Sequence, residues 1–329
     1  MYTDYSMSNT TVYYIIVTYN NKDLVDECIN SLHSQTYKTT RIVLVDNGSS
    51  DGTVEYVTKN YPDIHLIDAG ENLGFAKANN IGIDYAKNDS ACGYISLINS
   101  DATIDNKWTE TLVTFADQQK HSACFQTPTL DYYDHSVLDS RGITVDRYGR
   151  PTQLGYREKY KRKTSHVVFG VNAAACLISV DFLKSQPFSD YFDEDMWMYI
   201  EDVDLAARST MLGWKNWCVD GAFAYHMGSA SSSKNPGFSI FYIYRNNLSM
   251  LVKNFPLGIL LQTFVGAIVT DIMTLLKLVK HKDKVALKAL IKGRSESIKS
   301  ISIYIKKRKK ITSARSISHR DLITLMDAK

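Results

Sequence analysis

Strand-like and helix-like segments alternate along the N-terminal part of the chain, and this alternation limits the chain to a few folds. Short runs rich in β-branched and aromatic residues occupy residues 12–18, 41–45, 64–67 and 94–98. Between them, residues 22–34, 53–60 and 75–86 carry apolar side chains at helical spacing. Strands that alternate with helices of this length predict a mostly parallel, doubly wound α/β sheet.

Polar clusters follow these predicted elements at residues 18–20, 46–52, 72–79 and 99–101. Each cluster falls at or just beyond the end of a predicted strand. Ligands of open α/β sheets bind outside the carboxyl ends of the strands. The clusters therefore predict a ligand site along that edge of the sheet.

The first clusters carry groups that suit a nucleoside. Asp46 opens a Gly/Ser-rich turn, where its carboxylate can accept the imide N–H of uracil or thymine, or can simply cap the turn. Thr18 and Asn20 offer a hydroxyl and an amide at the neighbouring strand end. A close-approach glycine and two amides that suit the base and ribose follow in the next cluster: Gly74, Asn72 and Asn79. Neither G-x-G-x-x-G nor a P-loop motif occurs, so neither a dinucleotide fold nor a P-loop is indicated.

A second group of polar residues points to chemistry on a phosphorylated donor. Carboxylates crowd together at Glu201, Asp202 and Asp204, which is costly unless a cation, a proton or a substrate hydroxyl shares the site. Combined with Asp101 and His226, they predict a bound Mg²⁺ or Mn²⁺ next to a carboxylate base. The simpler alternative is that the acids open a helix, where they favour the helix dipole, and that His226 is an ordinary semi-buried residue.

Charge is distributed unevenly along the chain. Residues 271–329 contain 16 Lys/Arg and 5 Asp/Glu, whereas the remaining residues contain 22 and 30. A strongly basic tail indicates contact with anionic lipid or nucleic acid. A nucleic-acid-binding tail would interleave aromatic and basic residues, but residues 306–310 have only Tyr304 nearby. We therefore expect an anionic membrane surface and no nucleic acid as partner.

The apolar run at residues 257–279 is long enough to cross a membrane, but Asp271 near its middle is costly in lipid. We expect residues 236–329 to form a helical, membrane-associating extension that lies on the bilayer, and residues 1–235 to form the catalytic domain. The alternative is a helical region that only packs on the body. Five scattered cysteines and a polar N-terminus predict a cytoplasmic protein, peripheral on the inner face of the cell membrane.

Residues 125–170 show no clear hydrophobic period. Within them, residues 139–163 are predicted to form a long, partly mobile excursion near the site.

Taken together, these motifs resemble the inverting glycosyltransferases of family 2, which have the GT-A fold, and in particular bacterial rhamnosyltransferases that build surface polysaccharides. The resemblance covers about residues 12–254. It depends on Val17-Thr18-Tyr19-Asn20, on residues 45–53, 72–76, 97–102 and 201–205, and on His226.

The resemblance implies a role for each motif. Asp46 would recognise the pyrimidine, Asp101 matches the last carboxylate of a metal-binding D-x-D motif, and Asp202 matches the catalytic base. His226 resembles the histidine that ligates the metal in some relatives. Asn99 stands where the first acid of D-x-D is expected, so metal dependence stays open.

The implied reaction moves a sugar from a dTDP- or UDP-sugar to a lipid-linked glycan. L-Rhamnose from dTDP-rhamnose is our first choice, followed by UDP-linked galactose, glucose or galactofuranose. Asp202 would take the proton from the acceptor hydroxyl that attacks the anomeric carbon, and Glu201 and Asp204 would fix this corner. A nucleotidyltransferase would need a Gly-rich basic loop that residues 18–21 lack. A non-catalytic nucleic-acid- or membrane-binding protein, led by the basic tail, is the alternative of another class.

Overall fold

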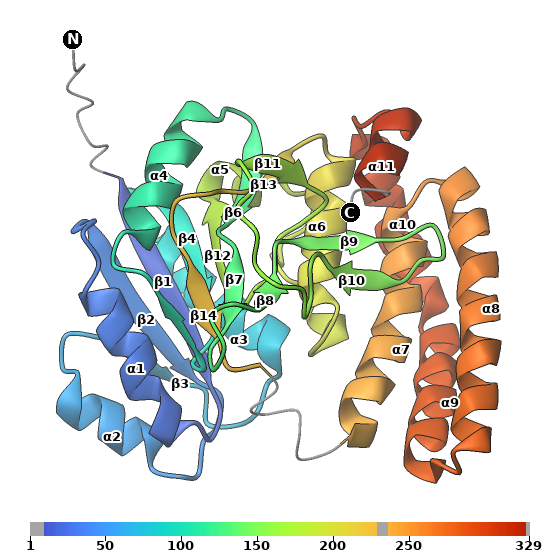
Figure 1. Cartoon of the computed structure of the whole chain (residues 1–329), viewed down its shortest axis with the longest axis horizontal. Helices are drawn as coiled ribbons and strands as arrows, with labels where there is room; N and C mark the ends of the chain where they lie inside the picture. Colours follow the sequence, from blue (N-terminus) through green and yellow to red (C-terminus); the bar gives the residue numbers. More distant parts are fainter. Residues whose placement is uncertain (1–9, 229–235, 327–329) are drawn as a thin grey trace.

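An eight-stranded sheet forms the centre of the computed structural model, which describes residues 10–228 and 236–326 (Figure 1). Its strand order is β11-β13-β6-β12-β4-β1-β2-β3. The strands are β1 (Thr11–Thr18), β2 (Thr40–Asp46), β3 (His65–Asp68), β4 (Cys92–Ile98), β6 (Ser122–Gln126), β11 (His166–Val168), β12 (Ala175–Ser179) and β13 (Lys215–Cys218). Apart from β11 and β12, these strands run in one direction. The predicted mostly parallel α/β sheet is therefore confirmed.

Helices cover both faces of this sheet: α1 (Lys22–His33), α2 (Thr53–Asn60), α3 (Phe75–Lys87), α4 (Trp108–Gln118), α5 (Val180–Ser185) and α6 (Glu201–Met211). Alternate residues of β1 belong to different parts of the core. Tyr14 and Ile16 pack in the cluster that contains α1 and α4, whereas Tyr13 and Ile15 pack in the cluster that contains α3. Because the strand is buried on both faces, it is a continuous apolar run without alternation.

Short strands occupy the region without a hydrophobic period. The strands β5 (Ala102–Ile104), β7 (Thr129–Asp131), β8 (Leu138–Ser140) and β14 (Ala224–His226) form a small sheet of order β5-β14-β7-β8. A hairpin of β9 (Ile143–Val145) and β10 (Pro151–Gln153) follows. The predicted long excursion over residues 139–163 therefore contains short strands that the sequence did not reveal, and its partial mobility stays a prediction. Strands of three residues are too short to reveal a period in the sequence.

The C-terminal part is helical, as predicted: α7 (Pro236–Asn254), α8 (Leu257–Lys280), α9 (Lys284–Lys299), α10 (Ile301–Ala314) and α11 (His319–Met326). Figure 1 shows α7 to α10 at the end of the molecule opposite α1 and α2. Helices α7, α8, α10 and α11 share a buried cluster with α6 and β9, in which Leu251, Phe255 and Tyr304 pack with Val203 and Val145. The predicted domain boundary between residues 235 and 236 adjoins residues 229–235, which lie outside the described residues, and it stays a prediction.

Helix α8 presents an exposed apolar stripe. Within the described residues, it is the one helix long and apolar enough to cross a membrane by length and composition. Its exposed side chains recur at helical spacing: Leu257, Leu261, Phe264, Val265, Ile268, Val269, Ile272, Met273, Leu276 and Val279. Asp271 is ion-paired with Arg294 of α9, Oδ2 to Nε at 2.6 Å, so its charge is compensated within the protein.

Candidate active site

A cleft of about 430 Å³ lies where β1, β2 and β4 end. Tyr19, Asn47 and Asn99 line it directly after these three strands. Residues 151–153 of β10, the start of α6 and His226 of β14 line it as well. The predicted edge of the sheet therefore does hold a cavity, and the predicted proximity of residues 139–163 to it is confirmed.

Asp202 lies in the first turn of α6 and lines this cleft. Its Oδ1 accepts a hydrogen bond from the backbone N–H of Val203 at 2.7 Å. Burial raises the pKa of Asp202, and hydrogen bonds from backbone N–H groups offset part of this effect. A half-buried carboxylate with a raised pKa at a cleft has the properties of a general base.

Glu201, next to it, also lines the cleft but is buried. Within the described residues its Oε2 has no hydrogen-bond partner. Burial, followed by the neighbouring Asp202 charge, raises its pKa well above the usual range. Two adjacent acids that resist ionisation are the costly arrangement that the sequence indicated.

The loop that leads into α6 has an unfavourable backbone. Trp197, Tyr199 and Ile200 have φ angles of 63°, 63° and 71°. Each non-glycine residue in this region costs about 1–3 kcal/mol, and a β-branched residue such as Ile200 is a pronounced outlier. Such conformations persist only where surrounding contacts hold them, and they cluster at functional sites.

His226 lies between two carboxylates. Its Nε2 is 3.4 Å from Asp101 Oδ1, and its Nδ1 is 3.0 Å from Asp139 Oδ2. Burial by itself lowers the pKa of His226, but its hydrogen bonds to Asp101 and Asp139 outweigh burial and raise the pKa to about 10. Asn99 lies beside this group, with its Nδ2 3.5 Å from His226 Nε2. The predicted pair of Asp101 and His226 is thus brought together at the cleft.

This group can be tested against a divalent metal. Ligating histidines commonly donate their second ring N–H to a carboxylate, and Asp139 is placed to accept it. Nε2 then faces Asp101, so a cation would meet one imidazole and one carboxylate. Within the described residues, no group of three or more His, Cys, Asp or Glu side chains could hold a metal ion. The residues therefore fit a metal that completes its coordination with donor phosphate and water.

Thr18 and Asp46 are adjacent in the parallel register of β1 and β2. Asp46 is fully buried, and its Oδ2 accepts a hydrogen bond from Ser49 N–H at 2.8 Å. Within the described residues, Asp46 Oδ1 and Thr18 Oγ1 have no hydrogen-bond partner. Neither residue lines the cleft directly, although Val17, Tyr19 and Asn47 beside them do. Orphaned buried oxygens of this kind call for a specific explanation, such as a ligand.

Of the other predicted nucleoside contacts, some line the cleft and others do not. Asn72 lines the cleft, and its Oδ1 accepts hydrogen bonds from Asn47 Nδ2 and Gly74 N–H. Asn20 has a structural role, because its Oδ1 accepts the Ser50 N–H at 2.8 Å. It does not line the cleft.

Gly74 and Asn79 are likewise not among the residues of the cleft. Asn79 is buried, and its Nδ2 donates to Phe75 O within α3. Gly74 has φ +82°, and a Cβ there would lie 2.6 Å from the ring and carbonyl oxygen of Trp197. The lack of a side chain at Gly74 therefore makes room for Trp197 in the loop before α6. The sequence had instead predicted that this glycine allows a nucleoside to approach closely.

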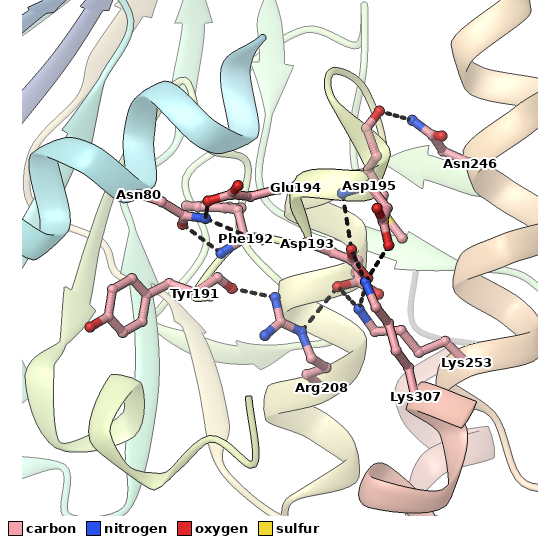
Figure 2. A network of polar contacts seen from close by, with 12 residues as sticks. Asn80, Tyr191, Phe192, Asp193, Glu194, Asp195, Arg208, Asn246, Lys253 and Lys307 are labelled. Atoms are coloured by element: carbon pink, nitrogen blue, oxygen red, sulfur yellow. Dashed lines mark hydrogen bonds and ion pairs between the residues drawn. The ribbon is translucent and has the colours of Figure 1, made fainter. Parts of the chain in front are cut away.

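Asp204 faces away from the cleft into a buried ionic network. Its Oδ2 accepts hydrogen bonds from Arg208 Nε at 3.0 Å and Lys253 Nζ at 2.8 Å. Lys253 also contacts Asp193 Oδ2, and Lys307 of α10 contacts Asp193 Oδ1; Figure 2 shows both lysines at Asp193. The network connects α6, α7 and α10, so Asp204 stabilises this corner through the C-terminal helices.

Sequence reasoning missed several residues that build the site. Asp139 carried no signal, because it lies in the region without a period. Asn246 belongs to none of the sequence motifs, although its side chain contacts the loop before Asp202. Tyr19 and Asn21 flank the predicted Asn20 and line the cleft in its place.

The fold and the position of the cleft define an α/β enzyme of the GT-A type. Solved structures with this arrangement include TarS residues 1–349 of S. aureus, with TM-score 0.57, 17% identity, and coverage of 96% of this chain and 90% of that one. They also include the mannosyltransferase PcManGT of Pyrobaculum calidifontis with GDP-Man and Mn²⁺, with TM-score 0.54, 15% identity, and coverage of 92% and 85%.

The sequence comparison identifies the family. Residues 13–184 match the model of glycosyl transferase family 2, and the chain belongs to this family. It is therefore a glycosyltransferase. A similar protein is an N-acetylglucosaminyl-diphospho-decaprenol L-rhamnosyltransferase of Mycobacterium tuberculosis, 28% identical over 68% of this chain and 78% of that protein. Another is the Escherichia coli UDP-Glc:alpha-D-GlcNAc-diphosphoundecaprenol beta-1,3-glucosyltransferase WfaP, 26% identical over 67% and 79%.

Proposed function

We propose that this glycosyltransferase transfers its sugar with inversion, and that Asp202 is the general base. The observation that carries the proposal is the position of Asp202, at the start of α6 in the cleft, with a raised pKa. Asp202 removes the proton of an acceptor hydroxyl as that oxygen attacks the anomeric carbon. The bond to the nucleoside diphosphate breaks on the opposite face, and the diphosphate leaves with its electron pair.

The donor nucleotide binds at the ends of β1 and β2. Asp46 Oδ1 and Thr18 Oγ1 lack partners within the described residues, and a pyrimidine can supply an imide N–H and a carbonyl oxygen there. Asn47 and Asn72, which line the cleft next to them, face the remaining nucleotide. A uridine or thymidine diphosphate meets these requirements equally well, because both bases carry the same imide.

Asp101 and His226 would hold a Mg²⁺ or Mn²⁺ ion with the donor bound, while Asp139 would fix the orientation of the imidazole. A divalent cation there would supply positive charge to the leaving diphosphate. The neutral amide of Asn99 keeps the count of negative ligands low, so we expect weak metal affinity without donor.

The names of the relatives support a proposal for the sugar and the acceptor. The mycobacterial protein is named for L-rhamnose, and both relatives are named for polyprenol-linked diphosphate sugars. We propose a lipid-linked acceptor in cell-surface glycan synthesis, with L-rhamnose from dTDP-rhamnose as donor sugar. A UDP-hexose or UDP-galactofuranose is the alternative, since WfaP is named for UDP-Glc.

The assay that tests the reaction uses dTDP- and UDP-sugars, Mg²⁺ or Mn²⁺, and polyprenol-diphosphate acceptors. Released nucleoside diphosphate is measured for the wild type and for Asp202→Asn. Acceptor-dependent release from dTDP-rhamnose, lost in the variant, supports the proposal. Release of UDP from a UDP-sugar would change only the proposed donor and would leave the proposed reaction in place. Equal release by Asp202→Asn overturns the assignment of the base.

We further propose that α8 lies on the cytoplasmic face of an anionic bilayer, with its exposed stripe in the interface. The support is that apolar residues occupy one face of a 24-residue helix, and that Lys277 and Lys280 follow at its end. Lysines reach lipid phosphates while apolar side chains enter the interface. This position brings the enzyme to an acceptor that resides in the membrane.

Vesicle sedimentation tests this position. The wild type should pellet with vesicles that contain phosphatidylglycerol, more weakly with phosphatidylcholine alone, and the double variant Phe264→Glu/Ile272→Glu should stay in solution. Equal pelleting of the variant overturns the role of the stripe. If the wild type does not bind vesicles but elutes as a dimer in size-exclusion chromatography, and the variant elutes as a monomer, the stripe serves self-association and the membrane proposal is overturned.

A further inference from the structure

The loop before Asp202 is held by its carbonyl groups. Asn246, a buried residue of α7, donates from Nδ2 to the carbonyl oxygens of Met196, Met198 and Tyr199 at 2.7, 2.9 and 2.8 Å. Figure 2 shows its amide directed at this loop. The carbonyl of Trp197 accepts the N–H of Ala76 in α3 at 3.1 Å. Four successive carbonyls are therefore bound by two helices that are far apart in the sequence.

The loop needs such support because of its backbone. The positive φ angles of Trp197, Tyr199 and Ile200 are sparsely populated conformations for residues with side chains. Ile200 immediately precedes α6, and Asp202 is two residues further on. Any relaxation of the loop to ordinary φ angles would rotate or shift the start of α6, and with it the carboxylate of Asp202.

Asn246 is suited to this role by its chemistry. Its side-chain amide is fully buried and supplies N–H donors to these carbonyls. Its Oδ1 in turn accepts a hydrogen bond from Arg245 Nη1 at 3.2 Å. The ring of Trp197 also stacks on Tyr242 of α7, with centroids 5.0 Å apart. One face of α7 therefore contacts both the backbone and a side chain of the loop.

We propose that Asn246 is a positioning residue for the catalytic base, so that the C-terminal helices complete the active site. This inference rests on the proposed role of Asp202. Asn246 holds residues 196–199 in the strained conformation that directs Asp202 into the cleft, and it takes no direct part in the chemistry.

Two variants test this role. Asn246→Ala removes the donors, and the isosteric Asn246→Asp places an acceptor against three carbonyl oxygens. The matched control is Asn247→Asp, because Asn247 is also buried on α7 but makes no hydrogen bond to the loop. Like Asn246→Asp, the control places a buried carboxylate on α7. Thermal unfolding then shows whether the two variants lose the same stability.

We expect kcat to fall roughly 100-fold in both Asn246 variants, the loss that a displacement of about 1 Å produces. The donor KM and the binding of nucleoside diphosphate should be little changed. Amide hydrogen exchange in a peptide covering residues 194–204 should accelerate in both variants and not in Asn247→Asp.

Unchanged exchange in a folded Asn246→Ala overturns the proposal, as does an equal loss of kcat in Asn247→Asp. The proposed reaction is judged separately. If Asp202→Asn keeps full activity while exchange still accelerates in the Asn246 variants, the loop contact stands and the assignment of the base fails.

Discussion

Two parts of the same cleft are built in different ways. Thr18 and Asp46 lie at the ends of adjacent strands, and the parallel register of β1 and β2 alone sets their spacing. Asp202 instead follows a loop with three unfavourable φ angles, which α3 and α7 hold from outside. The proposed donor side therefore depends on a regular sheet, whereas the proposed catalytic side depends on contacts between distant segments. Substitutions far from the cleft should disturb the catalytic side more readily.

The largest effect is expected from the base itself. Asp202→Asn keeps the shape of the side chain but cannot accept the proton, so kcat should fall by roughly 100- to 10,000-fold. Calorimetry should show that nucleoside diphosphate still binds, because Thr18 and Asp46 are untouched. Asp131→Asn, which loses an ion pair with Arg157 outside the cleft, serves as control and should keep its activity. Loss of nucleotide binding in Asp202→Asn would contradict the separation of the two sides.

The pH profile sharpens the same experiment. In the proposed mechanism the ionised Asp202 is the active form, and burial raises its pKa above the ordinary value of 3.8. Wild-type kcat/KM should therefore fall as the pH decreases through this raised pKa. The residual activity of Asp202→Asn should lack this acidic limb.

The next largest effect is expected on stability, from the ionic network that links α6 to the C-terminal helices. Lys253 is 1% exposed and contacts both Asp193 and Asp204, so Lys253→Met leaves two buried carboxylates with fewer cations. Breaking a buried pair costs about 3–5 kcal/mol of unfolding free energy. Lys307→Met removes a lysine that is 22% exposed and should cost less than half as much. Equal losses in chemical denaturation would show that burial does not set the strength of this network.

Glycine substitutions compare the loop contact with backbone strain alone. Gly74 and Gly70 have φ +82° and +72°, but a Cβ meets Trp197 at 2.6 Å in the first and open space in the second. Gly70→Ala should therefore cost about 1–2 kcal/mol of stability. Gly74→Ala should cost more and should also lower kcat, because Trp197 must move. If both variants lose the same stability and keep their kcat, Gly74 is not needed to position the loop before α6.

The smallest effect is expected at Glu201, where a substitution should raise the stability of the protein instead of lowering it. Its pKa is raised well above 4.5 in the folded protein, so folding binds protons and stability falls as the pH rises between the unfolded and folded values. Glu201→Gln removes this penalty. The variant should melt a few degrees higher than the wild type at neutral pH and at a similar temperature near pH 4. A lower melting temperature at neutral pH would mean that Glu201 is stabilised in its charged form.

Much of the fold was predictable because its signals are local. The β-branched run of β1 and the helical spacing of α3 are visible within a few residues of sequence. Asp46 and Asp101 could be proposed as site residues because polar residues at or just beyond a strand end are a local pattern too. The strands β8, β9 and β10 were missed because three residues show no period, and Asp139 in β8 escaped notice with them.

The sequence by itself determined the parallel sheet, the polar residues at its carboxyl edge, the acidic start of α6 and the apolar helix α8. Tertiary structure decided which of these residues meet. It paired His226 with Asp139, 87 residues away, and set Asn246 of α7 against a loop about 50 residues earlier. It also left Gly74 and Asn79 outside the lining of the cleft and packed Trp197 against the glycine. The reason is physical: strand and helix periods are set by neighbours in the chain, whereas a strained loop depends on donors that only packing of the whole fold can deliver.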